Sequence, residues 1–70
     1  MTLNKQIGMR IRYLRTQKKM SQEDLALEAD VNKNYLSDLE RGTRNPTLVI
    51  LSKIVNALGE TLESFFKGII

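Results

Sequence analysis

The 70-residue chain contains no cysteine and no histidine. Without cysteine, neither a disulfide nor a thiolate metal site can supplement a core that is marginal at this length. Without histidine, the commonest general base and the commonest nitrogen ligand for a metal are both missing. Four serines are present, but none has a recognisable base partner. We therefore expect neither enzymatic activity nor a bound metal or cofactor.

Long apolar segments are also lacking. No run approaches the roughly 20 apolar residues that cross a bilayer, and the first residues, MTLNKQIG, lack the apolar stretch of a signal peptide. We expect a cytoplasmic protein with no membrane partner. The composition, 41% hydrophobic and 27% charged, is typical of a globular protein. The length predicts one domain over residues 1–70, for which oligomerisation is a common source of extra stability.

Charge is distributed unevenly along the chain, whose net charge is +3. Residues 1–20 contain six basic residues and no acidic one, whereas residues 21–40 contain six acidic residues and one lysine. A basic segment is usually only a solvated surface, and the segment with the clearest motif is acidic. Charge alone therefore does not establish nucleic-acid binding, and that hypothesis depends on the placement of individual residues.

Apolar spacing and capping residues predict five helices and no strand. The expected helices cover about residues 3–18, 21–29, 32–41, 47–58 and 61–67. Ser21 and Asn32 are the expected N-caps, with Asp24 completing a weaker form of the capping box, and Gly42 suits the end of a helix. Met9 and Met20 are interpreted as apolar fill. The residues expected to face inward are Ile7, Ile11, Leu14, Leu25, Ala26, Ala29, Leu36, Leu39, Leu48, Leu51, Ile54, Val55 and Leu58.

Residues 21–42, SQEDLALEADVNKNYLSDLERG, form the most informative segment. Two short helices are joined there by a tight turn, in which Asp30 stands where a positive φ is needed and Val31 fills an apolar position. The second helix begins with Asn32, Lys33 and Asn34, where a buried helix would show apolar residues. This pattern predicts a helix-turn-helix whose second helix enters the major groove of DNA.

Over nearly its whole length the chain resembles the Cro/CI/Xre-type helix-turn-helix family. The matching residues are Gln22, Leu25, Ala26, Val31, Tyr35, Leu36, Leu39, Glu40, Gly42, Asn45, Pro46 and the run LVILSKIVNALG. The segment NYLSDLERGTRNPT and the short length are most similar to controller proteins of restriction–modification systems, although small phage-type and antitoxin-type regulators share the pattern. The resemblance implies an all-α, compact five-helix lambda-repressor-like domain that binds double-stranded DNA and regulates transcription.

The resemblance also implies roles at matching positions. The expected base-reading residues are Lys33, Asn34, Ser37 and Asp38. The expected phosphate-binding residues are Ser21, Gln22, Tyr35, Arg41, Thr43, Arg44, Asn45 and, as a weaker candidate, Arg12. Arg15 and Glu40 resemble the family's buried ion pair and are interpreted as structural.

Side-chain chemistry agrees with some of these roles and leaves others open. Lys33 can donate to O6 and N7 of guanine, and Asn34 can pair bidentately with adenine. Asp38 either accepts from N4 of cytosine, orients a neighbour or is a solvated acid. Tyr35 either lies along the DNA backbone, touches a thymine methyl or packs half-buried.

Residues 61–70 are too apolar for a free surface. Phe65, Phe66, Ile69 and Ile70 exceed what so small a core needs, and a large exposed apolar patch marks an interface. We expect a homodimer through this segment, with two reading helices about 34–36 Å apart on a pseudo-palindromic operator. The alternative is that Phe65 completes the core and the tail frays.

Three functional hypotheses follow from these patterns. The leading one is a DNA-binding dimer that regulates transcription by occupying its operator, with RNA polymerase as a further partner through the acidic surface around Glu23 and Asp24. The second is an antitoxin or adaptor of the same fold, which would bind a protein partner and select no DNA site. An enzyme is the third and has the least support.

Overall fold

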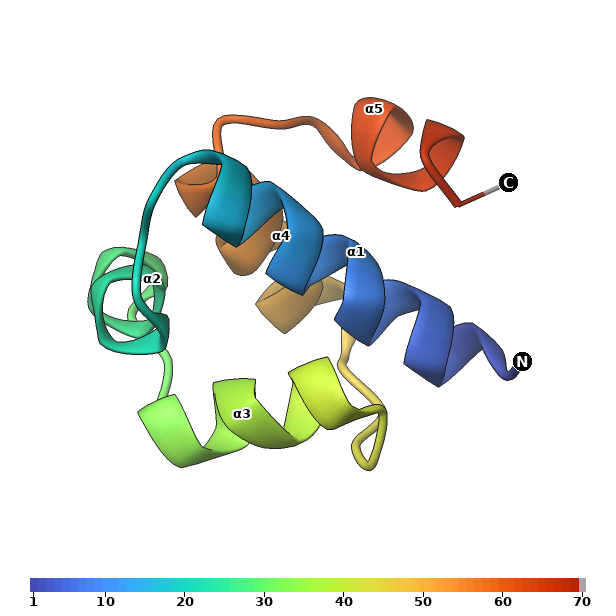
Figure 1. Cartoon of the computed structure of the whole chain (residues 1–70), viewed down its shortest axis with the longest axis horizontal. Coiled ribbons are helices and arrows are strands. Elements are labelled where there is room, and N and C mark those ends of the chain that lie inside the picture. Colours follow the sequence, from blue (N-terminus) through green and yellow to red (C-terminus); the bar gives the residue numbers. More distant parts are fainter. Residues whose placement is uncertain (70) are drawn as a thin grey trace.

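The computed structural model describes residues 1–69. That part of the chain forms five helices: α1 (Leu3–Gln17), α2 (Gln22–Ala29), α3 (Lys33–Arg41), α4 (Leu48–Ala57) and α5 (Leu62–Lys67). In Figure 1, α1 crosses the middle of the molecule, with α3 below it and α5 above it. The helix α1 packs against α3, and α2 packs against both α3 and α4. The predicted all-α fold is confirmed, with no strand in residues 1–69. None of these five helices is long and apolar enough to span a bilayer.

Each helix begins after a polar side chain that caps its free N–H groups. The caps, each of which accepts a hydrogen bond from a backbone N–H of the first turn, are Thr2, Ser21, Asn32, Thr47 and Thr61. At α2 the capping box is complete, because the Asp24 carboxylate accepts from the Ser21 N–H at 2.9 Å. This hydrogen bond holds the pKa of Asp24 below its usual value. The predicted caps at Ser21 and Asn32 are confirmed, so local sequence determines where these helices start.

One apolar core connects all five helices. Its buried residues are Ile7, Ile11, Leu14, Leu25, Ala26, Ala29, Leu36, Leu39, Leu51, Ile54, Val55, Leu58 and Phe65. The inward spacing predicted from the sequence is confirmed except at Leu48, which is 73% exposed because the first turn of α4 lies at the edge of the core. The prediction for Met9 is also wrong, since this side chain is 55% exposed, whereas Met20 packs against the core.

Phe65 and Arg10 attach α5 to the rest of the molecule. The Phe65 ring is fully buried, and the Arg10 Nε donates to the Phe65 carbonyl at 3.2 Å. The prediction that Phe65 belongs to an exposed interface is therefore wrong, because its ring completes the core of its own chain. Phe66 and Ile69 are partly buried against that core, and Ile70 lies outside the described residues.

Candidate nucleic-acid interface

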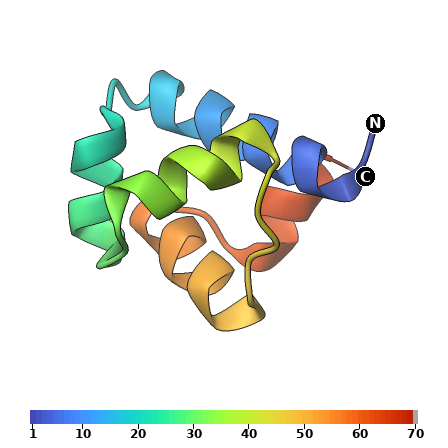
Figure 2. The ribbon, with the colours of Figure 1, turned by 90° about the horizontal axis from the view of Figure 1, so that it is seen from below.

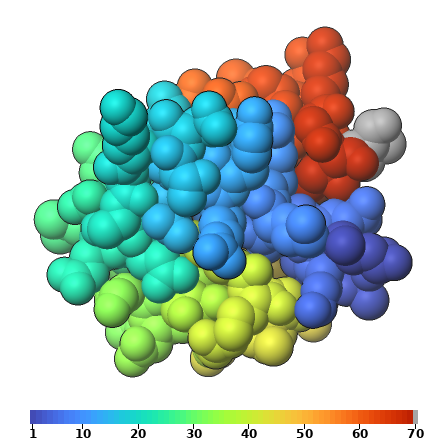
Figure 3. All heavy atoms as spheres, in the orientation of Figure 1, coloured from blue at the N-terminus to red at the C-terminus, as the bar shows by residue number. Residues whose placement is uncertain are grey.

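The helix α3 lies at the edge of the molecule and turns a polar face outward. Its side chains form the lower edge of the face in Figure 3, and Figure 2, seen from below, shows α3 crossing in front of the other helices. Leu36 and Leu39 anchor its inner side in the core. Helical spacing places the predicted base-reading residues on the opposite side of the helix. These residues are Lys33, Asn34, Ser37 and Asp38.

A buried ion pair between Arg15 and Glu40 fixes α3 to α1. The Arg15 Nε and Nη2 atoms donate to the two carboxylate oxygens at 2.7 and 2.9 Å, and only 12% and 4% of the two side chains is exposed. The hydrogen bond to Glu40 raises the pKa of Arg15 above its usual value. Removing one partner would leave the other charge without its counter-ion in a partly desolvated place, which destabilises the fold. The predicted ion pair is confirmed, and it joins the end of α3 to α1.

Gln22, the first residue of α2, has a structural partner that the sequence did not reveal. Its amide nitrogen donates to Oε1 of Glu40 at 3.1 Å, which ties the start of α2 to the end of α3. A glutamine amide carries two N–H donors, so one remains for a phosphate. The Ser21 hydroxyl accepts from the Asp24 N–H at 3.0 Å as a cap, and its own hydrogen remains for a phosphate.

The close approach of α1 to α3 depends on Gly8. A β-carbon at this position would overlap the carbonyl oxygen of Leu39 and would lie 2.7 Å from that of Glu40. Two helix backbones can come this close only where one of them has no side chain. Gly8 and the Arg15–Glu40 pair therefore position α3 together.

Five of the predicted contact residues form one connected group, which we call the Asp38 cluster. The Asp38 carboxylate pairs with Arg41 on α3, and its Oδ2 lies 3.5 Å from the Arg44 Nε in the following loop. Arg41 also donates from Nη1 to the Ser37 hydroxyl at 3.0 Å. The Arg44 guanidinium lies over the half-buried Tyr35 ring, 4.9 Å from its centroid. The structure therefore brings base-reading and phosphate-binding candidates into contact.

Lys33 and Asn34 are the least engaged of the base-reading candidates. The Lys33 Nζ lies 3.8 Å from Oε1 of Glu23, a pair between exposed side chains that contributes little to stability. The Asn34 side chain forms no hydrogen bond within the described part of the chain, whereas its backbone N–H donates to the Asn32 cap at 2.8 Å. Both side chains are therefore available to a partner.

The other phosphate-binding candidates lie in two places. In the loop after α3, the Thr43 hydroxyl donates to the Asp38 carbonyl at 3.1 Å, and Asn45 accepts a hydrogen bond from Asn4 of α1. Arg12 is exposed on α1, and within residues 1–69 no hydrogen bond or ion pair joins it to α3. The loop candidates therefore adjoin the reading helix, whereas Arg12 has no hydrogen bond or ion pair to it within residues 1–69.

A hollow beside α3 contains a basic residue that the sequence analysis missed. Lys53 of α4 lines this hollow together with Asn34, Tyr35 and Arg44. Ile50, three positions earlier in α4, lines it as well. The sequence alone did not indicate that this side of α4 faces α3.

Comparison with known proteins places these features in context. The model of the helix-turn-helix family matches residues 11–65. The chain is 51% identical over 53 residues to control protein C.BamHI of Bacillus amyloliquefaciens, a match that covers 74% of this chain and 65% of that protein. It is 41% identical over 63 residues to control protein C.MunI of a Mycoplasma species, covering 89% of this chain and 85% of that protein.

A solved structure has a closely similar fold. It is the restriction–modification controller protein C.Esp1396I, crystallised as a tetramer in complex with its natural 35 base-pair operator. The two structures superpose with a TM-score of 0.92 at 32% sequence identity, over 99% of this chain and 91% of that chain.

Proposed function

This chain belongs to the Xre-type helix-turn-helix family of DNA-binding transcription regulators, and we propose that it is a restriction–modification controller that binds a pseudo-palindromic operator as a homodimer. The observation that carries the proposal is the outward polar face of α3, fixed to the core by the Arg15–Glu40 pair. A rigid support of this kind holds reading side chains in one geometry relative to the bases. Similarity to two control proteins supports the controller role.

Lys33 and Asn34 read bases in this proposal. Both lie in the first turn of α3, the end of a recognition helix that meets base edges in the major groove. Lys33 donates to guanine O6 and N7, and Asn34 pairs with adenine N6 and N7. Neither side chain gives up a strong contact in the free protein, since Lys33 has only its long pair with Glu23.

Residues around α3 bind the phosphates. Gln22 donates its second amide hydrogen, aided by the free N–H groups and the dipole at the start of α2. Arg41 and Arg44 bind the DNA backbone beyond the end of α3, and Lys53 extends this basic surface. Such contacts supply affinity and orientation, while the base contacts supply sequence preference.

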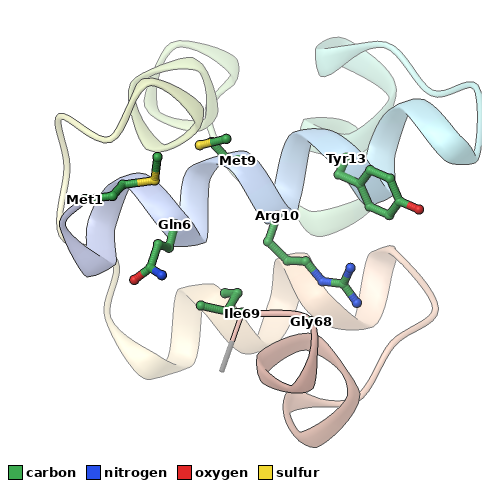
Figure 4. Close-up of a pocket in the computed structure, with 7 residues that line it drawn as sticks. All are labelled: Met1, Gln6, Met9, Arg10, Tyr13, Gly68 and Ile69. Carbon is green, nitrogen blue, oxygen red and sulfur yellow. The ribbon is translucent and has the colours of Figure 1, made fainter.

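We assign the dimer interface to the surface formed by α1 and the end of the chain. Figure 4 shows Met9 and Tyr13 on α1 and Ile69 beyond α5, around one hollow. Met9 and Tyr13 are 55% and 54% exposed, and the partly buried Phe66 and Ile69 continue the apolar surface. A second copy of the chain would cover these side chains. The tetramer of C.Esp1396I supports self-association.

Occupancy of the operator is the proposed regulatory step. A bound dimer blocks RNA polymerase or helps to recruit it according to where the operator lies. The surface proposed to face the polymerase is the exposed side of α2, where Glu23 and Asp24 accompany Leu27, which is 84% exposed.

Selection of bound sites from random duplex DNA tests the proposal. We expect one preferred sequence with two symmetric half-sites, two chains bound per site in sedimentation, and an affinity that falls steeply between low and physiological salt. Selection of no DNA site, together with copurification of one stoichiometric protein partner, would instead support an antitoxin or adaptor and contradict the proposal.

A further inference from the structure

Asp38 places a negative charge on the surface that is proposed to face DNA. Only 28% of its side chain is exposed, and both carboxylate oxygens are engaged, Oδ1 by Arg41 and Oδ2 by Arg44. Each carboxylate oxygen can accept more than one hydrogen bond, but both oxygens of Asp38 already face arginines of the same chain. The contacts that the structure gives Asp38 are therefore with side chains of its own chain.

We propose that Asp38 is a positioning residue that holds Arg41 and Arg44 in their DNA-binding orientation and lowers the affinity for random DNA. This inference rests on the proposed DNA-binding function and adds to it a residue that determines specificity. The Tyr35–Arg44 contact belongs to the same Asp38 cluster.

Arg41 and Arg44 can bind phosphate while they remain paired with the Asp38 carboxylate. A guanidinium carries five N–H donors in a planar fork. Arg44 faces Asp38 with Nε, so both of its Nη groups remain for a phosphate. Arg41 uses one Nη on Ser37 and the other on Asp38, so its Nε–H and the remaining Nη hydrogens stay unused. Side chains ordered before binding lose less freedom when the complex forms.

The negative charge of Asp38 also favours the preferred operator over random DNA. It offsets part of the attraction of the arginines for any phosphate, and this electrostatic attraction dominates non-specific binding. On the preferred operator, the base contacts place the phosphates where the oriented arginines can bind them. These well-oriented contacts compensate for the attraction that the charge of Asp38 removes. Asp38 therefore raises the ratio of specific to random affinity without contacting a base.

The test compares Asp38→Asn with Glu28→Gln, which removes one negative charge from an exposed side chain of α2. Affinities of each variant are measured for the preferred site and for random duplex DNA over a range of salt. For Asp38→Asn we expect random DNA to bind about threefold more tightly and the affinity ratio to fall about threefold or more. The preferred bases should stay unchanged, and Glu28→Gln should keep the wild-type ratio.

Two outcomes of this test would overturn the inference. A changed base preference at one operator position would make Asp38 a base reader. Equal ratios in the two variants would make it a solvated acid. If the wild-type chain selected no DNA site at all, the proposed function itself would fail instead.

A second measurement follows the arginine side chains directly in the absence of DNA. In the free wild-type protein, the Nε–H group of Arg44 should be more rigid by ¹⁵N relaxation and exchange more slowly than that of the exposed Arg12. Asp38→Asn should make Arg44 resemble Arg12, whereas Glu28→Gln should not. Equal mobility of the two arginines in the wild-type protein would contradict a positioning role for Asp38.

Discussion

At the residue scale, two junctions of the chain hold a left-handed backbone at residues that are not glycine. Asp30 has φ 57° and ψ 48° between α2 and α3, and Lys19 has φ 57° between α1 and α2. The left-handed region costs an L-residue about 1–2 kcal/mol, and aspartate tolerates it better than lysine does. Both turns are therefore less stable than they could be.

Replacement of either residue by glycine should stabilise the protein. We expect Asp30→Gly and Lys19→Gly to raise the free energy of unfolding by about 0.5–1 kcal/mol, with the larger gain at Lys19, because glycine adopts positive φ without steric cost. Lys18→Gly is the matched control, since Lys18 has φ −90° and glycine there only adds freedom to the unfolded chain. Thermal or urea unfolding measures all three, and a loss of stability in the first two variants would contradict the account.

Individual residues differ in how far the sequence could predict them. The positive φ of Asp30 was predicted and is confirmed, because the turn between two recognisable helices leaves few alternatives. The positive φ of Lys19 was not, because nothing marks lysine as a turn residue. The contacts of Asp38 with Arg41 and Arg44 were left among three alternatives, since the sequence does not determine the side-chain conformations on which they depend.

At the scale of the helices, the crossing of α1 and α3 determines where the reading face points. Gly8 permits the contact between the two helix backbones, and the Arg15–Glu40 ion pair joins the same two helices. The binding geometry therefore depends on residues that do not themselves face DNA.

A methyl group at Gly8 should disturb both stability and recognition. We expect Gly8→Ala to lower the free energy of unfolding by about 1–3 kcal/mol, because α3 must move to relieve the overlap with the Leu39 carbonyl. The same movement should reduce the preference for the operator over random DNA. Met9→Ala, at the next position but 55% exposed, should change stability by about 0.5 kcal/mol or less. Similar unfolding midpoints for the two variants would show that the crossing tolerates a side chain.

The helices were largely predictable, but the partners of α5 were not. Caps such as Ser21 and Asn32 are local signals, and the structure confirms them. Phe65 seemed surplus to the core because composition does not measure the space between helices, which this ring fills. The hydrogen bond from Arg10 to α5 joins residues 55 positions apart, and no local pattern predicts such a contact.

At the scale of the whole molecule, the acidity of residues 21–40 is largely balanced within the fold. Glu40 pairs with Arg15, Asp38 with Arg41 and Arg44, and Glu23 with Lys33, while the Asp24 carboxylate caps a helix. The helix-turn-helix of residues 21–42 can therefore approach a polyanion even though its sequence is acidic. In the proposed complex, the basic residues that supply affinity are Arg41 at the end of α3, Arg44 in the following loop and Lys53 of α4.

Lys33 and Asn34 are proposed to read sequence while Arg44 supplies affinity, and a single ratio of affinities distinguishes these roles. It is the ratio of affinity for the preferred operator to affinity for random duplex DNA, compared between the wild-type chain and the variants Lys33→Ala, Asn34→Ala and Arg44→Ala at one salt concentration. We expect Lys33→Ala and Asn34→Ala each to lower this ratio by about 5- to 150-fold, the equivalent of about 1–3 kcal/mol per lost base contact. Arg44→Ala should weaken both affinities and should change their ratio much less than either of these variants does. Equal losses on operator and random DNA for Lys33→Ala and Asn34→Ala would contradict the account.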